Sequence, residues 1–216
     1  MSDFPIAGDS PTASRIAWSP DGQYIAAGRD PRVSRGMSAG IYLIPVDGGE
    51  ARAVTEPTHP TFDFSPAFSP DARRIAYASC TKFDVLAPVY FPMNCDVRVV
   101  DIDTTLRQAG AVRTLTPRTD LLPRGSRTLA PSWTRDGKSV VFFGEVGSDV
   151  HLWRVWLGGE RPPERVELAG SPALHPATGA SHDRLVFSRY EWDDHLYRFN
   201  EGRPSEQDCC LLLIRD

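Results

Sequence analysis

One segment recurs along the chain, and this repeat constrains the fold more than any other feature of the sequence. Residues 15–27 read Arg-Ile-Ala-Trp-Ser-Pro-Asp-Gly-Gln-Tyr-Ile-Ala-Ala, and related sequences fill residues 66–77 and 131–142. A degraded copy begins at Pro172 and, after a small insertion, resumes at Arg184. The anchor residues of the four copies are Trp18, Phe68, Trp133 and Leu174. Because one such unit cannot bury its apolar faces alone, the copies are expected to stack side by side.

Each good copy contains the sequence of a tight turn between two strands. Proline presets φ, the aspartate side chain bonds to its own backbone, and glycine tolerates a positive φ. The turn residues are Asp21, Gly22, Asp71, Asp136 and Gly137. Since the aspartates recur at one position of the repeat, we interpret them as turn residues rather than as catalytic carboxylates.

Two more strands are expected after each turn. The third strands lie at residues 41–46, 96–101, 150–155 and 195–199, and the outer strands at 51–55, 112–116 and 165–168. The 17 glycines and 19 prolines separate short apolar runs, which is typical of many strands joined by turns. Four antiparallel strands in about 40 residues make one blade of a β-propeller. The sequence therefore predicts an all-β fold with four-stranded blades at about residues 15–57, 66–118, 131–168 and 172–214.

The repeat also resembles a known family. The Trp/Phe-Ser-Pro-Asp-Gly-x-x-Ile-Ala-Tyr segment, followed by an Ile-Tyr strand and the turn Asp47-Gly48-Gly49, resembles the WD-like repeat of TolB-type propellers from about Arg15 to Asn200. Propellers of this family usually have about six or more blades, so the resemblance implies a fragment of a six-bladed propeller. Residues 184–199 are similar to repeats in bacterial regulators that join a winged-helix or kinase output domain to a propeller.

An arc of about four blades does not close into a ring. Its first and last blades each present an apolar face without a neighbouring blade, which favours association. We expect self-association through these open blade edges, or a partner chain, to cover them.

The composition argues against several classes of function. A formal net charge of −4 disfavours nucleic acid and anionic lipid as partners, because both reward a basic surface. No apolar stretch approaches the roughly 20 residues that span a bilayer, so we expect no membrane insertion by this segment. Residues 1–14 do not read as a signal peptide. The five histidines lack paired ligand spacing and no P-loop or dinucleotide fingerprint is present, so no metal or cofactor is expected.

Loop lengths indicate where a partner would bind. In a four-stranded meander, the second-to-third and inter-blade connections lie on one face, and here they include the long segments 29–40, 56–65, 81–94, 117–129 and 190–194. We call this face the loop-rich face and expect a protein or small ligand to bind there. Its candidate residues are Arg29, Arg32, Arg35, Tyr90, Phe91, Arg124, Tyr190, Trp192 and Asp193. The alternative is that these loops pack on each other and merely tolerate insertion.

Two cysteines end one strand and begin the next in the second copy. Because those strands should pair antiparallel, Cys80 and Cys95 are expected nearly opposite each other. A disulfide there would imply a periplasmic or other extracytoplasmic location. The alternative is two reduced thiols in a cytoplasmic chain.

A catalytic pattern also occurs. Gly36-Met37-Ser38-Ala39-Gly40 matches the nucleophile elbow of serine hydrolases, but that chemistry needs a helix after the serine and here a strand follows. The sequence thus predicts a non-catalytic propeller that acts as a protein-interaction or ligand-sensing module of a larger bacterial signalling or envelope protein. Two alternatives stay open. One is the gating propeller of a prolyl-oligopeptidase-type hydrolase without its catalytic domain, and the other is a stand-alone propeller that binds a small molecule or glycan.

Overall fold

Strands make up nearly all the regular structure of the chain. The computed structural model describes residues 15–29, 39–84, 91–103, 108–116, 127–146, 149–159, 161–179, 184–189, 197–200 and 203–209. In these residues every regular element is a strand except η1, a 3-10 turn at Glu167–Ala169. The predicted all-β class is therefore confirmed. No helix in the described ranges has the length and apolar character needed to cross a membrane.

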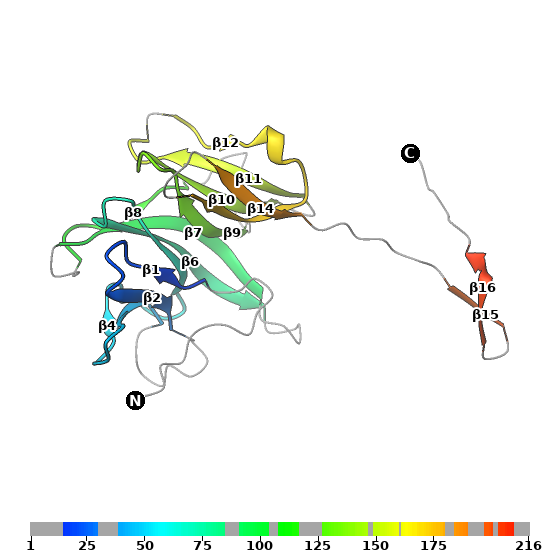
Figure 1. Cartoon of the computed structure of the whole chain (residues 1–216), viewed down its shortest axis with the longest axis horizontal. Coiled ribbons are helices and arrows are strands. Elements are labelled where there is room, and N and C mark those ends of the chain that lie inside the picture. Colours follow the sequence, from blue (N-terminus) through cyan, green and yellow to red (C-terminus); the bar gives the residue numbers. More distant parts are fainter. Residues whose placement is uncertain are drawn as a thin grey trace.

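Three sheets of four antiparallel strands follow one another along the chain (Figure 1). The first unit contains β1 (Ala17–Trp18), β2 (Tyr24–Gly28), β3 (Ile41–Pro45) and β4 (Arg52–Ala53). The second contains β5 (Phe62–Phe68), β6 (Arg74–Asp84), β7 (Phe91–Asp101) and β8 (Arg113–Thr114). The third contains β9 (Arg127–Trp133), β10 (Ser139–Val146), β11 (Asp149–Trp156) and β12 (Glu164–Arg165). Each strand pairs with the next in sequence, so each unit is a meander.

The second unit buries both of its faces, which explains its almost continuous apolar sequence. Side chains alternate between the faces of a strand. On one face of β6, Ile75 and Tyr77 join a core with Leu43 of the first unit. On the other face, Ala76 joins a core with Phe142 of the third unit. Stacked sheets, rather than a separate helical layer, therefore form the core between neighbouring units.

A bulge in the first strand of each later unit fixes how the repeats align. Ser65, Ala130 and His175 have φ near +50°, and each precedes a proline. The pairing register shifts at the same place in β5, in β9 and in β13 (Ala173–Thr178). Beyond the bulge, the equivalent cross-strand pairs are Phe68↔Ile75, Trp133↔Val140 and Thr178↔Leu185.

This alignment corrects the sequence interpretation of the fourth copy. The residue at the anchor position is Thr178, and Leu174 lies four residues earlier, before the bulge. The prolines that correspond are Pro66, Pro131 and Pro176, so Pro172 is not the equivalent residue and the copy needs no insertion. The error arose because Pro172-Ala-Leu imitates the local sequence of the anchor, while strand register depends on pairing with β14 (Leu185–Arg189).

The fourth unit also differs from the four-stranded sheet expected over residues 172–214. β13 pairs with β14, whereas β15 (Tyr197–Asn200) and β16 (Arg203–Cys209) pair with each other as a separate hairpin. One face of the β13–β14 sheet packs against the third unit through Leu185 and Phe187. On the other face Val186 is 67% exposed, so no sheet in the described part of the chain covers it. The third unit differs in a smaller way, because η1 replaces most of the outer strand expected at 165–168.

Arg15 ties the first unit to two others. Its backbone amide donates to Ser65 Oγ at 3.2 Å, and its Nη1 donates to the carbonyl oxygen of Pro176 at 2.6 Å. Burial lowers the pKa of Arg15. Arg15 thus connects the first strands of the first, second and fourth units.

Candidate functional site

The structure describes few of the residues proposed for the loop-rich face. Arg29 follows β2, where its backbone amide donates to the carbonyl oxygen of Gly40 at 3.0 Å and its guanidinium lies 5.6 Å from the centre of the Tyr42 ring. Phe91 begins β7, but its side chain lies outside the description. The remaining candidates also fall outside the described residues: Arg32, Arg35, Tyr90, Arg124, Tyr190, Trp192 and Asp193. Their grouping on one face stays a prediction.

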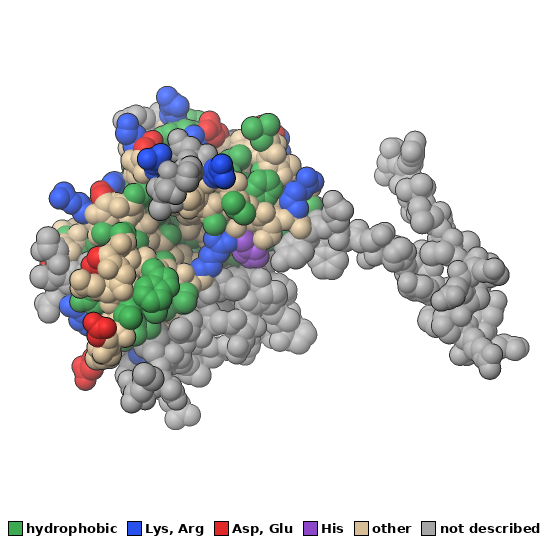
Figure 2. Space-filling model, in the orientation of Figure 1, with side chains coloured by type: hydrophobic (Ala, Val, Ile, Leu, Met, Phe, Trp, Pro, Cys, Tyr) green, Lys and Arg blue, Asp and Glu red, His purple; other side chains and the backbone are tan. Residues whose placement is uncertain are grey.

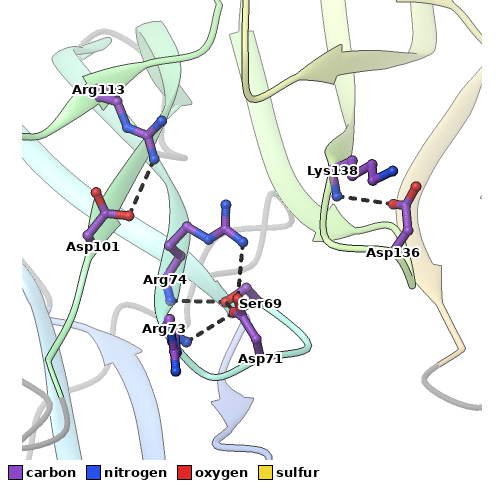
Figure 3. Close-up of polar contacts among 8 residues, drawn as sticks. All are labelled: Ser69, Asp71, Arg73, Arg74, Asp101, Arg113, Asp136 and Lys138. Carbon is purple, nitrogen blue, oxygen red and sulfur yellow. Dashed lines mark hydrogen bonds and ion pairs between the residues drawn. The ribbon is translucent and has the colours of Figure 1, made fainter.

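The repeated aspartates lie in the tight turns and hold them by hydrogen bonds (Figure 3). Thr134 Oγ1 donates to Asp136 Oδ1 at 2.7 Å, and the Lys138 amide donates to the same oxygen at 3.0 Å. These two bonds keep the pKa of Asp136 below its ordinary value. Asp21 and Asp71 accept the corresponding bonds. Gly22 and Gly137 have φ of 72° and 64° in these turns.

Arg74 connects the turn of the second unit to the third. Its Nη2 donates to Asp71 Oδ2 at 3.1 Å, and its guanidinium carbon lies 5.3 Å from the centre of the Trp133 ring. Trp133 Nε1 in turn donates to the carbonyl oxygen of Ala67 at 3.0 Å. The repeat sequence therefore builds both the turn and the contact between units.

Cys80 and Cys95 are direct neighbours across β6 and β7, and a disulfide joins them in the structure. Both are fully buried in the core between the second and third units. The bond has a sequence separation of 15 residues and lies within the paired strands, which continue past it to Asp84 and Phe91, so the cysteines do not end one strand and begin the next as expected.

A cavity of about 780 Å³ lies between the first and second units, and the sequence analysis did not anticipate it. We call it the inter-unit groove. One wall is the outer edge of the first unit from Arg52 to Thr58, and the other contains Asp63, Tyr77 and Arg98 of the second unit. The groove includes the connection between the units, so one end of it belongs to the loop-rich face.

Asp63 is the buried carboxylate of this groove, with 3% of its surface exposed. Thr55 Oγ1 accepts a hydrogen bond from the Ile41 amide at 2.9 Å and donates to Asp63 Oδ2 at 2.7 Å. The other oxygen, Oδ1, is buried without a hydrogen-bond partner among the described residues. Burial raises the pKa of Asp63, and the nearby hydroxyls of Ser79 and Thr55 and the charge of Arg98 offset this only in part.

Arg98 lines this wall of the groove, and Ser79 lies on the same face of the second unit without lining it. Asp63 pairs with Ser79 across β5 and β6, and Tyr77 pairs with Arg98 across β6 and β7, so these four side chains occupy one face of the second unit. Within the described chain, Arg98 Nε and Ser79 Oγ are also buried without hydrogen-bond partners. Burial raises the pKa of Tyr77, and the neighbouring Asp63 raises it further.

One sequence signal could have located Asp63. It is the only charged residue in the strand Phe62–Phe68, and a charge inside an otherwise apolar strand is seldom buried without a partner. Thr116 of the second unit resembles Thr55 in one respect, because its Oγ1 accepts a hydrogen bond from the Val97 amide at 2.9 Å. The third unit has Thr128 at the position of Asp63, so it does not repeat the buried carboxylate.

Known proteins resemble the chain in structure. Neither a protein-family model nor a curated protein sequence matches it. A TolB-type protein from Agrobacterium tumefaciens matches with a TM-score of 0.58 and 24% identity, over 90% of this chain and 61% of that one. TolB from Acinetobacter baumannii matches with a TM-score of 0.57 and 19% identity, over 93% of this chain and 43% of that one.

The chain folds as a TolB-like β-propeller. A puromycin-hydrolysing peptidase from Mycobacterium tuberculosis shares this fold, with a TM-score of 0.51 and 24% identity over 76% of this chain and 24% of that one. The propeller described here spans less than two thirds of each of these proteins. The fold predicted from the repeat is thereby confirmed as a partial TolB-like propeller.

Proposed function

We propose that this propeller is a non-catalytic binding module, which recognises a protein or a small ligand at the loop-rich face for a larger bacterial signalling or envelope protein. The inter-unit groove is the observation that carries the proposal. It opens beside the connection between two units, and Asp63 and Arg98 each have a buried polar atom without a hydrogen-bond partner in the described residues. Such convergent polar groups in a concave site are typical of ligand pockets.

The contacts of the turn aspartates support a structural rather than a catalytic role for them. The turn aspartates each accept a hydroxyl and a backbone amide, which are the bonds that hold the turns. Asp63 is fixed by Thr55. Gly40, the last residue of the nucleophile-elbow pattern, has a structural explanation, because a Cβ there would clash with the carbonyl oxygen of Thr55.

A disulfide between Cys80 and Cys95 supports an extracytoplasmic location as part of this proposal. Intact mass of protein isolated from its native source, with and without reductant, tests it. Two results together would place the chain in a reducing compartment. Reduction would leave the mass unchanged, and the two cysteines would react with an alkylating reagent only after unfolding.

The second candidate function is the gating propeller of a serine hydrolase. It is favoured by the fold shared with the puromycin-hydrolysing peptidase, of which this chain covers 24%. A fluorophosphonate probe applied to the full-length native protein distinguishes the two, because a hydrolase gated by this propeller would carry its activated serine in a separate catalytic domain. We expect no labelling, and labelling of the native protein would overturn the non-catalytic proposal.

Site-specific photo-crosslinking in cells tests which face binds. A photoreactive amino acid at Arg29 reports on the loop-rich face, and one at Lys138, in a tight turn of the third unit, reports on the opposite face. We expect a discrete adduct from position 29 and none from position 138. Adducts of equal yield from both positions, or from position 138 alone, would contradict the proposed recognition face.

A further inference from the structure

The face of the first unit that carries Trp18 is apolar, and no other unit in the described part of the chain covers it. Trp18 is 57% exposed, and Figure 2 shows hydrophobic side chains gathered on the surface over β1. Ile25 and Ile44, which pair across β2 and β3, are partly exposed. The equivalent pair of the third unit, Val140 and Val155, is buried. An open apolar sheet face of this kind indicates an interaction surface.

The third unit shows what covers such a face. Trp133, the equivalent of Trp18, packs on the second unit, where Ala76 belongs to the same core. Its Nε1 donates to the carbonyl oxygen of Ala67 at 3.0 Å, and the guanidinium carbon of Arg74 lies 5.3 Å from the centre of its ring. A partner for the Trp18 face should therefore present a carbonyl acceptor, a small apolar side chain and an arginine in the same arrangement.

The fourth unit presents these three groups on its own open face. The pairing register of β13 and β14 places Ala177, Val186 and Arg184 at the positions of Ala67, Ala76 and Arg74. Val186 is 67% exposed, and Ala177 and Arg184 are exposed as well. The two open faces are thus complementary, because one carries an indole ring and the other carries the groups that receive an indole between the second and third units.

We propose that the Trp18 face of one copy of this chain packs on the open face of the fourth unit of a second copy, with Trp18 Nε1 donating to the carbonyl oxygen of Ala177 and Arg184 lying over the indole ring. The contact is head-to-tail, because two different faces meet. Two chains joined in this way have about eight units, at the upper end of the four to eight blades typical of propellers. This assembly goes beyond the proposed binding function and does not depend on it.

Sedimentation velocity of the full chain at a series of protein concentrations tests the proposal. We expect the wild type to associate reversibly. Trp18→Asp and Val186→Asp each put a charge into one of the two faces, and each should weaken association by about 10-fold or more, because a buried tryptophan contributes strongly to an interface. Both side chains are mostly exposed, so both variants should keep the fold, which circular dichroism checks.

A mixture of the two variants gives the sharpest test. Trp18→Asp keeps an intact fourth-unit face, and Val186→Asp keeps an intact Trp18 face. An equimolar mixture should therefore form a complex of two chains, although each variant alone stays monomeric. If two Trp18 faces packed on each other instead, Val186→Asp would associate like the wild type.

Leu168→Asp is the matched control. Leu168 is a fully exposed apolar residue of η1 in the third unit, so it belongs to neither open face. Association should be unchanged in this variant. If Val186→Asp fails to fold, Arg184→Glu tests the same face and should weaken association several-fold, because an anion replaces the cation over the indole ring.

Three results would overturn the proposal: a wild type that stays monomeric, association that the fourth-unit variants leave unchanged, or a mixture that forms no complex. Stability at different protein concentrations gives a further check. Association stabilises only copies that have met, so Trp18→Ala should cost little in dilute protein and more as concentration rises. A large cost that is the same at every concentration would mean that the indole is covered within one chain.

Failure of this assembly and failure of the proposed binding function are distinguishable. Photo-crosslinking from Arg29 reports on the loop-rich face, whereas Trp18 and Val186 lie on the open faces of the first and fourth units. A discrete adduct from position 29 together with a monomeric wild type would retain the binding function and remove the head-to-tail contact.

Discussion

Trp18 and Trp133 occupy the same position of the repeat but have different environments. Each pairs across its hairpin with an apolar residue seven positions later, Ile25 or Val140. Trp133 is 4% exposed, packs on the second unit and donates its Nε1 to the Ala67 carbonyl. Trp18 is 57% exposed, and Ile16, two residues earlier, is 50% exposed. Hydrophobic side chains gather on the surface over β1 (Figure 2). The repeat specifies the local structure of each unit, while the preceding unit decides whether its anchor is buried.

The largest expected effect comes from truncating the two anchors. Trp133→Ala should lower the free energy of unfolding by about 3–5 kcal/mol, because it removes a buried ring and its hydrogen bond. Trp18→Ala should lower it by less than about 1 kcal/mol, because most of the ring is exposed. Urea denaturation followed by circular dichroism measures both. Equal losses would mean that Trp18 is buried in solution by a contact outside the described residues.

The second unit also differs from the others in a covalent bond, because it alone carries the cross-strand cysteine pair. Opening the disulfide should destabilise the protein by about 3 kcal/mol, because a closed loop of 15 residues restricts the unfolded chain. The measurement is urea denaturation with and without reductant. A Cys80→Ala/Cys95→Ala variant serves as the control and should not respond to reductant. If reductant changes the stability of wild type and control equally, the disulfide does not stabilise the protein.

Two glycines of the first unit are needed for different reasons, one for a tight contact with another segment and one for the backbone conformation of a turn. Gly40→Ala should cost about 1–3 kcal/mol, because the added Cβ would clash with the Thr55 backbone. Gly22→Ala should cost about 1 kcal/mol, because the turn there needs φ of 72° but has open space around it. Ala72 already adopts φ of 55° at the equivalent turn position. Chemical denaturation of both variants measures the loss in free energy of unfolding. A larger loss for Gly22→Ala than for Gly40→Ala would mean that the turn conformation matters more than the contact with Thr55.

The smallest effect concerns pH. The pKa of Asp136 lies below its ordinary value of 3.8, so its stabilisation is present above that pH and disappears as pH falls through the folded pKa. The pKa of Asp63 is raised, so its favourable contribution is present below pH 3.8 and disappears as pH rises through the folded pKa. NMR titration of the two carboxyl groups should therefore give pKa values on opposite sides of 3.8.

Replacing each aspartate by asparagine shows how its pKa shift affects the stability of the protein. Asp136→Asn should cost a few tenths of a kcal/mol at neutral pH and nothing in strong acid, because the site is exposed. Asp63→Asn should flatten the dependence of stability on pH between 3.8 and neutral, because the buried group no longer ionises. Parallel pH profiles for Asp63→Asn and wild type would contradict the assignment.

Much of the fold could be predicted from the sequence, because its determinants are local. The turn chemistry of Asp71 or Asp136 operates within a few residues, and Ile75 and Ala76 reveal by their adjacency that both faces of a strand are covered. The fourth copy was misaligned because its anchor position holds Thr178, which has no aromatic signature. The groove could not be predicted, because Asp63 and Arg98 belong to separate strands of the second unit and Thr55 to the segment after the last strand of the first.

The sequence by itself determined that this chain forms repeated antiparallel meanders with aspartate-capped turns, because hydrogen bonds and φ preferences within one hairpin suffice for that. Only the tertiary structure decided that Trp133 is buried and Trp18 exposed, that Thr178 takes the fourth anchor position, and that Asp63 and Arg98 share a groove. Burial and pairing register depend on which sheet lies next to which, and that is a property of neighbouring units rather than of any single segment.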